Sequence, residues 1–259
     1  MNDAMPLEDG SNAEREDLAK PLPSWTRAEL TEVVLYGTHA SPATVKARAV
    51  LDLARVAYAR RFGKVGHSSY QKFPVVFVNG RQINDSHIIC KSLAPILFGT
   101  PLTEADLRVD EMTTYGLMLA CEIKAFSSPD CMRRWAALAG LTGGVTGFLV
   151  HLLAPFSLAQ RAADSLREKH PHLKEPVAYC RDLRQELEER ASPFFAGQQP
   201  GAIDASLFGA LAVWAAGGEY SMPFATEAIE HGGLQPWHER MTAVMPDLFQ
   251  KHGWWPLHT

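Results

Sequence analysis

The chain has 259 residues, of which 46% are hydrophobic and 21% are charged, and its formal net charge is −4. This composition is typical of a folded globular protein that is long enough for one large or two smaller domains. The slightly negative charge indicates no broad basic surface, so we expect no nucleic-acid partner.

The cysteines and histidines do not form a metal-binding pattern. The four cysteines are far apart, and no Cys-x-x-Cys pair or zinc-type Cys/His spacing is present. His170 and His172 are two residues apart, which does not place both on one helix face, and Pro171 between them favours a loop. The sequence therefore predicts a reduced protein with no bound metal.

The first 31 residues are polar and acidic, and they include Pro21 and Pro23. They match neither a secretory signal nor an Arg-rich transit peptide. We therefore expect residues 1–31 to form a polar N-terminal extension, which would need a partner to become ordered.

A strand, a loop and a capped helix come next. The apolar run from Val33 to Tyr36 predicts a buried strand. Ser41 is a favoured N-cap and Pro42 is favoured at the first helical position, so we expect a helix over 42–57. Main-chain N–H groups and the positive end of the helix dipole then point at the surroundings of Ser41, which suits a thiolate or another small anion.

Three further strands and a helix follow, which makes the order β-α-β-β-β-α. Asn79-Gly80 is a strong hairpin signal, and Asn84-Asp85-Ser86 is expected to cap the helix that closes near Phe98. Pro74 at a strand start indicates either a cis peptide bond or an edge-strand proline. The expected strands cover residues 58–62, 73–78 and 81–83.

After Pro101 the apolar residues recur with helical period to the end of the chain. Asp204 lies at a capping-box position after Gly201, which indicates a structural role. The expected helices cover residues 103–126, 129–139, 144–165, 173–191, 202–216, 224–231 and 234–245.

Residues 136–156 form an apolar stretch long enough to suggest a membrane span. The stretch also contains four glycines and His151, and its apolar density is modest. A helix pair buried in the bundle, or one that lies on a membrane or partner, is the preferred interpretation, so peripheral membrane contact through 136–156 stays open.

Four blocks of the sequence resemble prostaglandin E synthase 2, a family of the glutathione transferase type. The resemblance covers residues 33–245 and implies an α/β thioredoxin-like domain followed by an all-α glutathione transferase-type C-terminal domain. The implied division is 32–99 and 103–248, with an aromatic tail at 249–259. The blocks are Leu35 to Asp52, Phe73-Pro74-Val75-Val76, Gln82 to Ile89, and a helical part that includes Pro193 to Pro200 and Leu234-Gln235-Pro236-Trp237.

The resemblance also implies a glutathione site. In such proteins the residue before a cis-proline pairs its main chain with the tripeptide, and an Asp-Ser pair at a helix start binds the γ-glutamyl end. These positions are Phe73, Pro74, Asp85 and Ser86. The chemistry agrees, because helix N–H groups and Ser86 suit a carboxylate and Asp85 suits an ammonium group. The alternative is that Asn84, Asp85 and Ser86 only cap the helix.

The chain departs from the family at the thiol site. Where the family has Cys-Pro-Phe-Cys, this chain has Ser41-Pro42-Ala43-Thr44, and the family's nearby tyrosine aligns with Thr38. An alcohol cannot replace an attacking thiol, because its pKa is far too high without a strong base. We therefore expect no disulfide exchange, no prostaglandin isomerase activity, and weak or absent glutathione binding.

Two functions remain open, and whether the chain is an enzyme depends on which is right. The preferred one is a non-catalytic structural or interaction subunit of a larger protein assembly, because the thiols are missing and Trp254 and Trp255 suit an interface. The alternative is a glutathione-dependent transferase or isomerase, in which Ser41 donates a hydrogen bond to the glutathione thiolate. The resemblance implies a mitochondrial or membrane-associated setting, with the cytoplasm as the alternative.

Overall fold

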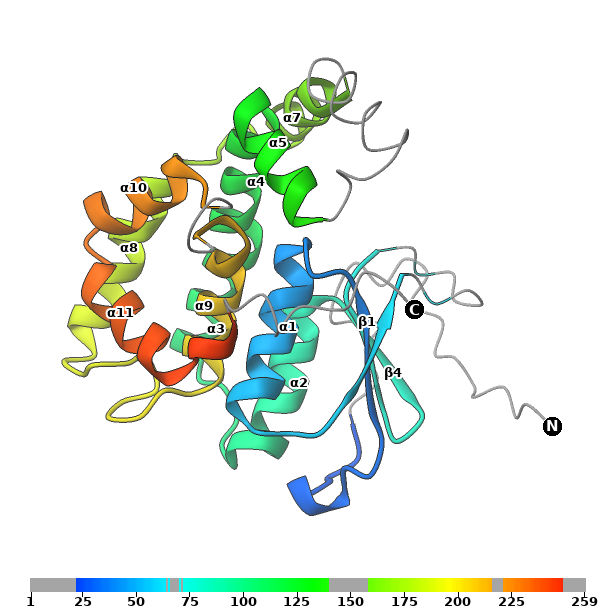
Figure 1. Ribbon diagram of the computed structural model, residues 1–259. Coiled ribbons are helices and arrows are strands. Elements are labelled where there is room, and N and C mark those ends of the chain that lie inside the picture. Colours follow the sequence, from blue (N-terminus) through cyan, green and yellow to red (C-terminus); the bar gives the residue numbers. More distant parts are fainter. Residues whose placement is uncertain are drawn as a thin grey trace.

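The computed structural model describes residues 22–63, 65, 70, 72–139, 158–215 and 221–248. In its first half two helices cover one face of a four-stranded sheet, and the described part of its second half is helical (Figure 1). The first half consists of β1 Val33–Gly37, α1 Pro42–Leu53, β2 Ala59–Phe62, β3 Val75–Val78, β4 Arg81–Asn84 and α2 Ser86–Phe98. The second half consists of α3 Glu104–Glu111, α4 Met118–Phe126, α5 Pro129–Leu138, α7 Leu158–Lys169, α8 Pro176–Glu189, α9 Ala202–Ala215, α10 Pro223–His231 and α11 Gln235–Val244.

The sheet has the strand order β2-β1-β3-β4 and the predicted succession β-α-β-β-β-α. β1 is parallel to β2 through the crossover helix α1, and it is antiparallel to β3, which is antiparallel to β4. The predicted β3–β4 hairpin is confirmed, and Asn79 and Gly80 take the positive φ values of 48° and 83° that such a turn favours.

Helix α1 begins as predicted, with Ser41 as its N-cap and Pro42 at its first position. The expected end at residue 57 is wrong, because the helix stops at Leu53. The physical reason is a local turn: Arg55 adopts a left-handed φ of 54°, which is incompatible with a continuing right-handed helix.

The predicted helix over 103–126 is interrupted by a π-helical segment, Met112–Leu117, between α3 and α4. The other predicted helices are present with shifted ends. Most of the predicted helix 144–165 and of the apolar stretch 136–156 lies outside the described residues, as do Gly217-Gly218. Among the helices described, none is long and apolar enough to cross a membrane.

Part of the expected polar extension packs on the first domain. Leu22, Trp25 and Leu30 lie against the hydrophobic core. Asn79 in the hairpin turn ties down the next residues, because its Oδ1 accepts from the N–H groups of Thr31 at 3.0 Å and Glu32 at 3.1 Å. Residues 1–21 and the predicted aromatic tail 249–259 lie outside the described residues.

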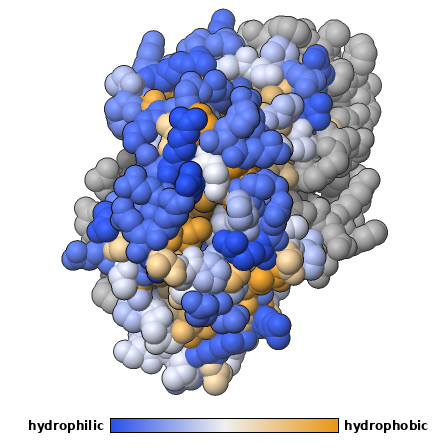
Figure 2. Space-filling view, turned by 90° about the vertical axis from the view of Figure 1, so that its left-hand side faces the viewer, coloured by the Kyte–Doolittle hydropathy of each residue, from blue (hydrophilic) through white to orange (hydrophobic). Residues whose placement is uncertain are grey.

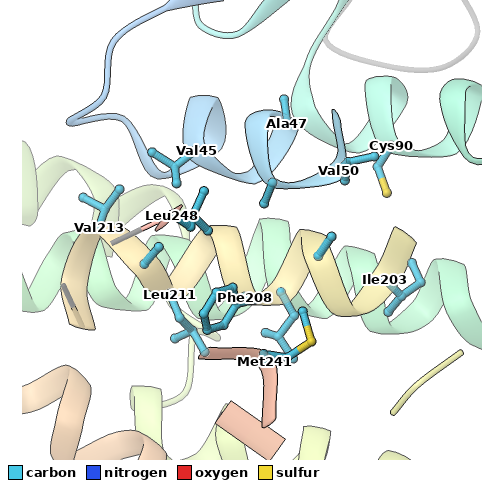
Figure 3. Close-up of a cluster of buried hydrophobic side chains, with 14 of the residues drawn as sticks. Val45, Ala47, Val50, Cys90, Ile203, Phe208, Leu211, Val213, Met241 and Leu248 are labelled. Atoms are coloured by element: carbon cyan, nitrogen blue, oxygen red, sulfur yellow. The ribbon is translucent and has the colours of Figure 1, made fainter. Parts of the chain in front are cut away.

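Helix α9 is the centre of the hydrophobic core. Every residue from Ala202 to Trp214 is buried, and α1 lies directly along the helix (Figure 3). A methyl group on Gly209 would lie 2.6 Å from the carbonyl oxygen of Val45 and 2.8 Å from Cα of Lys46. The two helices therefore approach closely because this position has no side chain.

Asp204 holds the start of α9, in agreement with its predicted structural role. Its buried carboxylate accepts hydrogen bonds from the main-chain N–H groups of Phe195, Ala196 and Gly201, at 2.9 to 3.1 Å, and from the indole of Trp237 at 2.9 Å. Gly201 at the N-cap has no side-chain oxygen, so Asp204 supplies the acceptor instead. Away from this core, the outer face of the helical half is mostly hydrophilic (Figure 2).

The close contact at Gly209 makes a prediction with a definite sign. Helix propensity alone would make Gly209→Ala stabilising by about 1 kcal/mol. Packing against α1 predicts the opposite, a decrease of about 1–3 kcal/mol in the free energy of unfolding, because the helices must move apart. Urea denaturation of wild type and variant measures this difference. A variant as stable as wild type, or more stable, would show that the helices are not in such close contact.

Candidate functional site

The sheet register brings the sequence-predicted site residues to one end of the strands, here called the sheet edge. Tyr36 of β1 pairs with Val75 of β3, and Val75 pairs with Asn84 of β4. β1 and β4 therefore end where β3 begins. The loop to Ser41, the Phe73-Pro74 pair and the start of α2 at Asp85-Ser86 all leave the sheet at this edge, so five candidate residues that are distant in sequence lie at one end of the fold.

The Phe73–Pro74 peptide bond is cis, as the resemblance implies. Pro74 is buried and Phe73 is half-buried. Within the described residues, neither the N–H nor the carbonyl of Phe73 makes a hydrogen bond. The main chain of Phe73 is thus available to pair with an extended peptide.

Asp85 is the N-cap of α2, since its Oδ1 accepts from the N–H of His87 at 2.8 Å. This confirms the capping interpretation for one oxygen of Asp85. Ser86 is different. It is 2% exposed, and within the described part of the chain neither its N–H nor its hydroxyl makes a hydrogen bond. Two donors at a helix N-terminus are therefore left for an anion.

Ser41 caps α1 through one lone pair. Its Oγ accepts from the N–H of Thr44 at 3.3 Å, and its own N–H donates to the carbonyl of Thr38 at 3.1 Å. A serine hydroxyl has one donor and two acceptor lone pairs, so the cap does not use the hydroxyl proton. Within the described residues that proton has no acceptor. The hydroxyl of Ser41 can therefore cap the helix and, at the same time, donate a hydrogen bond to a ligand.

Helix α5 fixes the loop before Ser41. The indole N–H of Trp135 donates to the carbonyl of Ala40 at 2.9 Å, and Nε2 of His39 donates to the carbonyl of Leu138 at 2.6 Å. Burial lowers the pKa of His39, and this outweighs the bond to Leu138, which raises the pKa. His39 is accordingly a neutral structural anchor near pH 7, and the two hydrogen bonds hold the loop against α5.

Thr44 lies in the first turn of α1, and it is 1% exposed. Its side chain packs against Gly37, where a methyl group would lie 2.5 Å from Cγ2 of Thr44. Its Oγ1 is buried without a hydrogen-bond partner among the described residues. Thr44 therefore fills space beneath the loop.

The four cysteines of the chain all lie within the described residues. All four are free and buried. Burial raises the pKa of the thiol groups of Cys90, Cys121 and Cys180, so these groups are protonated at neutral pH and are poor nucleophiles. No cluster of potential metal ligands occurs among the residues that the structure describes.

A buried polar cluster close to this site is absent from the sequence-based expectations. It contains Lys46 of α1, His87 of α2, Asp110 of α3 and Ser206 of α9, and all four are buried. One signal was available: Lys46 shares one face of its helix with the apolar residues Ala49, Val50 and Leu53. A lysine there needs a buried partner, because an unpaired charge would be very costly.

Known structures share this architecture. The apo form of glutathione S-transferase III is 14% identical, over 88% of this chain and 100% of that chain, with a TM-score of 0.52. The beta-etherase LigF from Sphingobium sp. strain SYK-6 is 12% identical, over 85% and 100%, with a TM-score of 0.51. A Tau class glutathione S-transferase from mango is 19% identical, over 86% and 94%, with a TM-score of 0.48.

No protein-family model and no curated protein sequence matches this chain. The structural similarity establishes the fold, and identities this low leave the activity open. They confirm the predicted fold class: the chain has the glutathione S-transferase fold, with a thioredoxin-like first half and a helical second half.

The unpartnered hydroxyl of Thr44 generates a stability prediction. Thr44→Val has nearly the same shape and removes a buried polar group that makes no hydrogen bond. We expect the free energy of unfolding to stay within about 0.5 kcal/mol of wild type or to rise, because no hydrogen bond is lost. Urea denaturation provides the measurement. A loss of more than about 1 kcal/mol would mean that the hydroxyl has a partner in solution.

Proposed function

We propose that this chain binds glutathione at the sheet edge formed by Phe73, Pro74, Asp85 and Ser86, and that Ser41 stabilises the glutathione thiolate for transfer to an electrophile. The observation that carries the proposal is the set of donors left over at this edge. Ser86 keeps two donors and Phe73 keeps its whole main chain without partners among the described residues.

These groups match the parts of the tripeptide. The N–H and hydroxyl of Ser86, at the positive end of α2, suit the γ-glutamyl carboxylate. Asp85 suits the γ-glutamyl ammonium group, since its cap uses only one carboxylate oxygen. The Phe73 main chain suits the cysteinyl peptide group. The proposal therefore departs from the weak binding that the lost thiols alone suggest.

Ser41 would favour the thiolate of glutathione and would not act as a nucleophile. A hydrogen bond to the charged form lowers a thiol's pKa, and the N-terminus of α1 adds a favourable dipole. The thiolate sulfur would then form a bond to an electrophilic carbon as a leaving group departs with its electron pair. No redox step is needed, which is consistent with the absence of both family thiols at Ser41 and Thr44.

A second candidate is a non-catalytic subunit, and one observation favours it. Trp135 and Leu138 of α5 bond directly to the two residues before Ser41, so the helical half covers the loop where the chemistry would occur. In this case the chain keeps the prostaglandin E synthase 2-like scaffold, with Ser41 and Thr44 in place of thiols, as a packing module. Its partners would be proteins of a larger assembly, with membrane contact through 136–156.

Ser41→Ala tests the first candidate, and Ser128→Ala is its matched control. Ser128 is also an N-cap before a proline, and it accepts from the N–H of Cys131 at the same 3.3 Å. Both variants should lose about 1 kcal/mol of stability through the lost cap. Only Ser41→Ala should raise the pKa of bound glutathione, by at least about one unit, because only Ser41 contacts the sulfur. Calorimetry and the pH dependence of thiolate absorbance measure these effects.

The outcomes separate the two candidates. Glutathione binding with a thiol pKa that depends on Ser41 and not on Ser128 supports the transferase. Binding with equal thiol pKa values in both variants contradicts a role for Ser41. Absence of glutathione binding by the folded wild type contradicts the first candidate, and a large complex in native mass spectrometry of the endogenous protein then supports the second.

A further inference from the structure

One buried carboxylate, that of Asp110 in α3, is shared by three other helices. Its Oδ2 accepts from Nζ of Lys46 in α1 at 2.9 Å and contacts Nδ1 of His87 in α2 at 2.6 Å. Its Oδ1 accepts from the hydroxyl of Ser206 in α9. Lys46 also donates to the hydroxyl of Thr114 in the π-helical segment. Asp110 thus joins the helices of the first half to those of the second.

The cluster is almost completely shielded from water, and it contains the ion pair Lys46–Asp110. The side chains of Lys46 and Asp110 have no exposed surface, and that of His87 is 2% exposed. Burial pulls the pKa of Asp110 upward, but the charge of Lys46 and the hydrogen bond from His87 outweigh it and hold this pKa below its usual value. A buried pair of this kind is tightly constrained in position, since either charge alone would be unfavourable.

The cluster reaches the candidate glutathione site through His87. This residue follows Ser86 directly, and it is held at both ends. Its main-chain N–H donates to Asp85, and its ring contacts Asp110. The first turn of α2 is therefore fixed by a carboxylate that belongs to the helical half. The same carboxylate fixes the first turns of α1, because it pairs with Lys46, which lies little more than one turn after Ser41.

We propose that Asp110 is a positioning residue for the γ-glutamyl carboxylate subsite. Through His87 it sets the place of the two Ser86 donors, so affinity for the carboxylate end of glutathione depends on how the helical half docks. This inference rests on the proposed glutathione function, and it adds that the helical half controls the subsite without touching the ligand.

Asp110→Asn tests the inference, and Asp106→Asn is the matched control. Asp106 lies one turn earlier on α3, where it pairs with Arg190 at 2.5 Å and completes the capping box with Thr103. The probes are glutathione and 4-aminobutyryl-cysteinyl-glycine, which lacks only the γ-glutamyl carboxylate. We expect Asp110→Asn to weaken glutathione about tenfold and to change the truncated tripeptide less than twofold. Asp106→Asn should change neither.

A second variant covers the case in which Asp110→Asn does not fold. His87→Ala keeps the Lys46–Asp110 pair and removes only the link to α2, and we expect the same selective loss for glutathione. Unchanged glutathione affinity in a folded Asp110→Asn or His87→Ala variant would overturn the inference, and so would an equal loss for both tripeptides or an equal effect of Asp106→Asn.

The failure of the proposed function would look different. If the wild type binds no glutathione, the main-chain amide resonance of Ser86 in the free protein still reports its position. It should shift in Asp110→Asn and stay unchanged in Asp106→Asn. Equal spectra at Ser86 in all folded variants would overturn the positioning role itself.

Discussion

The close packing of α1 on α9 is the constraint on which the rest of the molecule depends. Helix α9 is buried along almost its whole length, and the missing side chain at Gly209 lets the main chain of α1 approach it. α1 has Ser41 at its start and Lys46 one turn later. Because α9 fixes the position of α1, it also fixes the position of Ser41 and of the candidate thiol site.

The polar cluster at the same interface fixes how α1 and α9 are placed relative to each other along and around their axes. A hydrophobic contact tolerates small slides and rotations, whereas polar contacts of 2.9 Å and 2.6 Å to one carboxylate do not. Removing one partner of a buried pair costs about 3–5 kcal/mol, because the other charge is left uncompensated. The two halves should accordingly behave as one cooperative unit, in which the site and the helical half are ordered together.

The candidate site lies on the glutathione S-transferase fold, and at the start of α1 the chain has serine and threonine. Ser41 has N-cap geometry, and its hydroxyl proton has no acceptor among the described residues, while Thr44 is a space-filling residue beneath the loop. What remains at the sheet edge are donors and one acidic side chain, and the proposed function assigns them to binding a tripeptide. Any chemistry would have to come from the bound thiol itself, with the protein lowering its pKa.

Local signals made much of this predictable from sequence. The Asn79-Gly80 hairpin, the Ser41-Pro42 and Asp85 caps and the helical period after Pro101 each act within a few residues. The features that escaped depend on distant partners. Nothing near Lys46 reveals that Asp110 lies beside it, and the π-helical segment at Met112–Leu117 was hidden within a regular helical pattern. The position of Ser86 beside Phe73 and the loop before Ser41 likewise became visible only once the register of β1, β3 and β4 was known.

The most direct test of the account is a ¹⁵N-resolved NMR titration of the full chain with glutathione. The account predicts saturable shifts at the main-chain amides of Phe73 and Ser86 and at the loop that leads to Ser41, with little change on α8, α10 and α11. Absence of saturable shifts, or shifts centred on the outer face of the helical half, would contradict it.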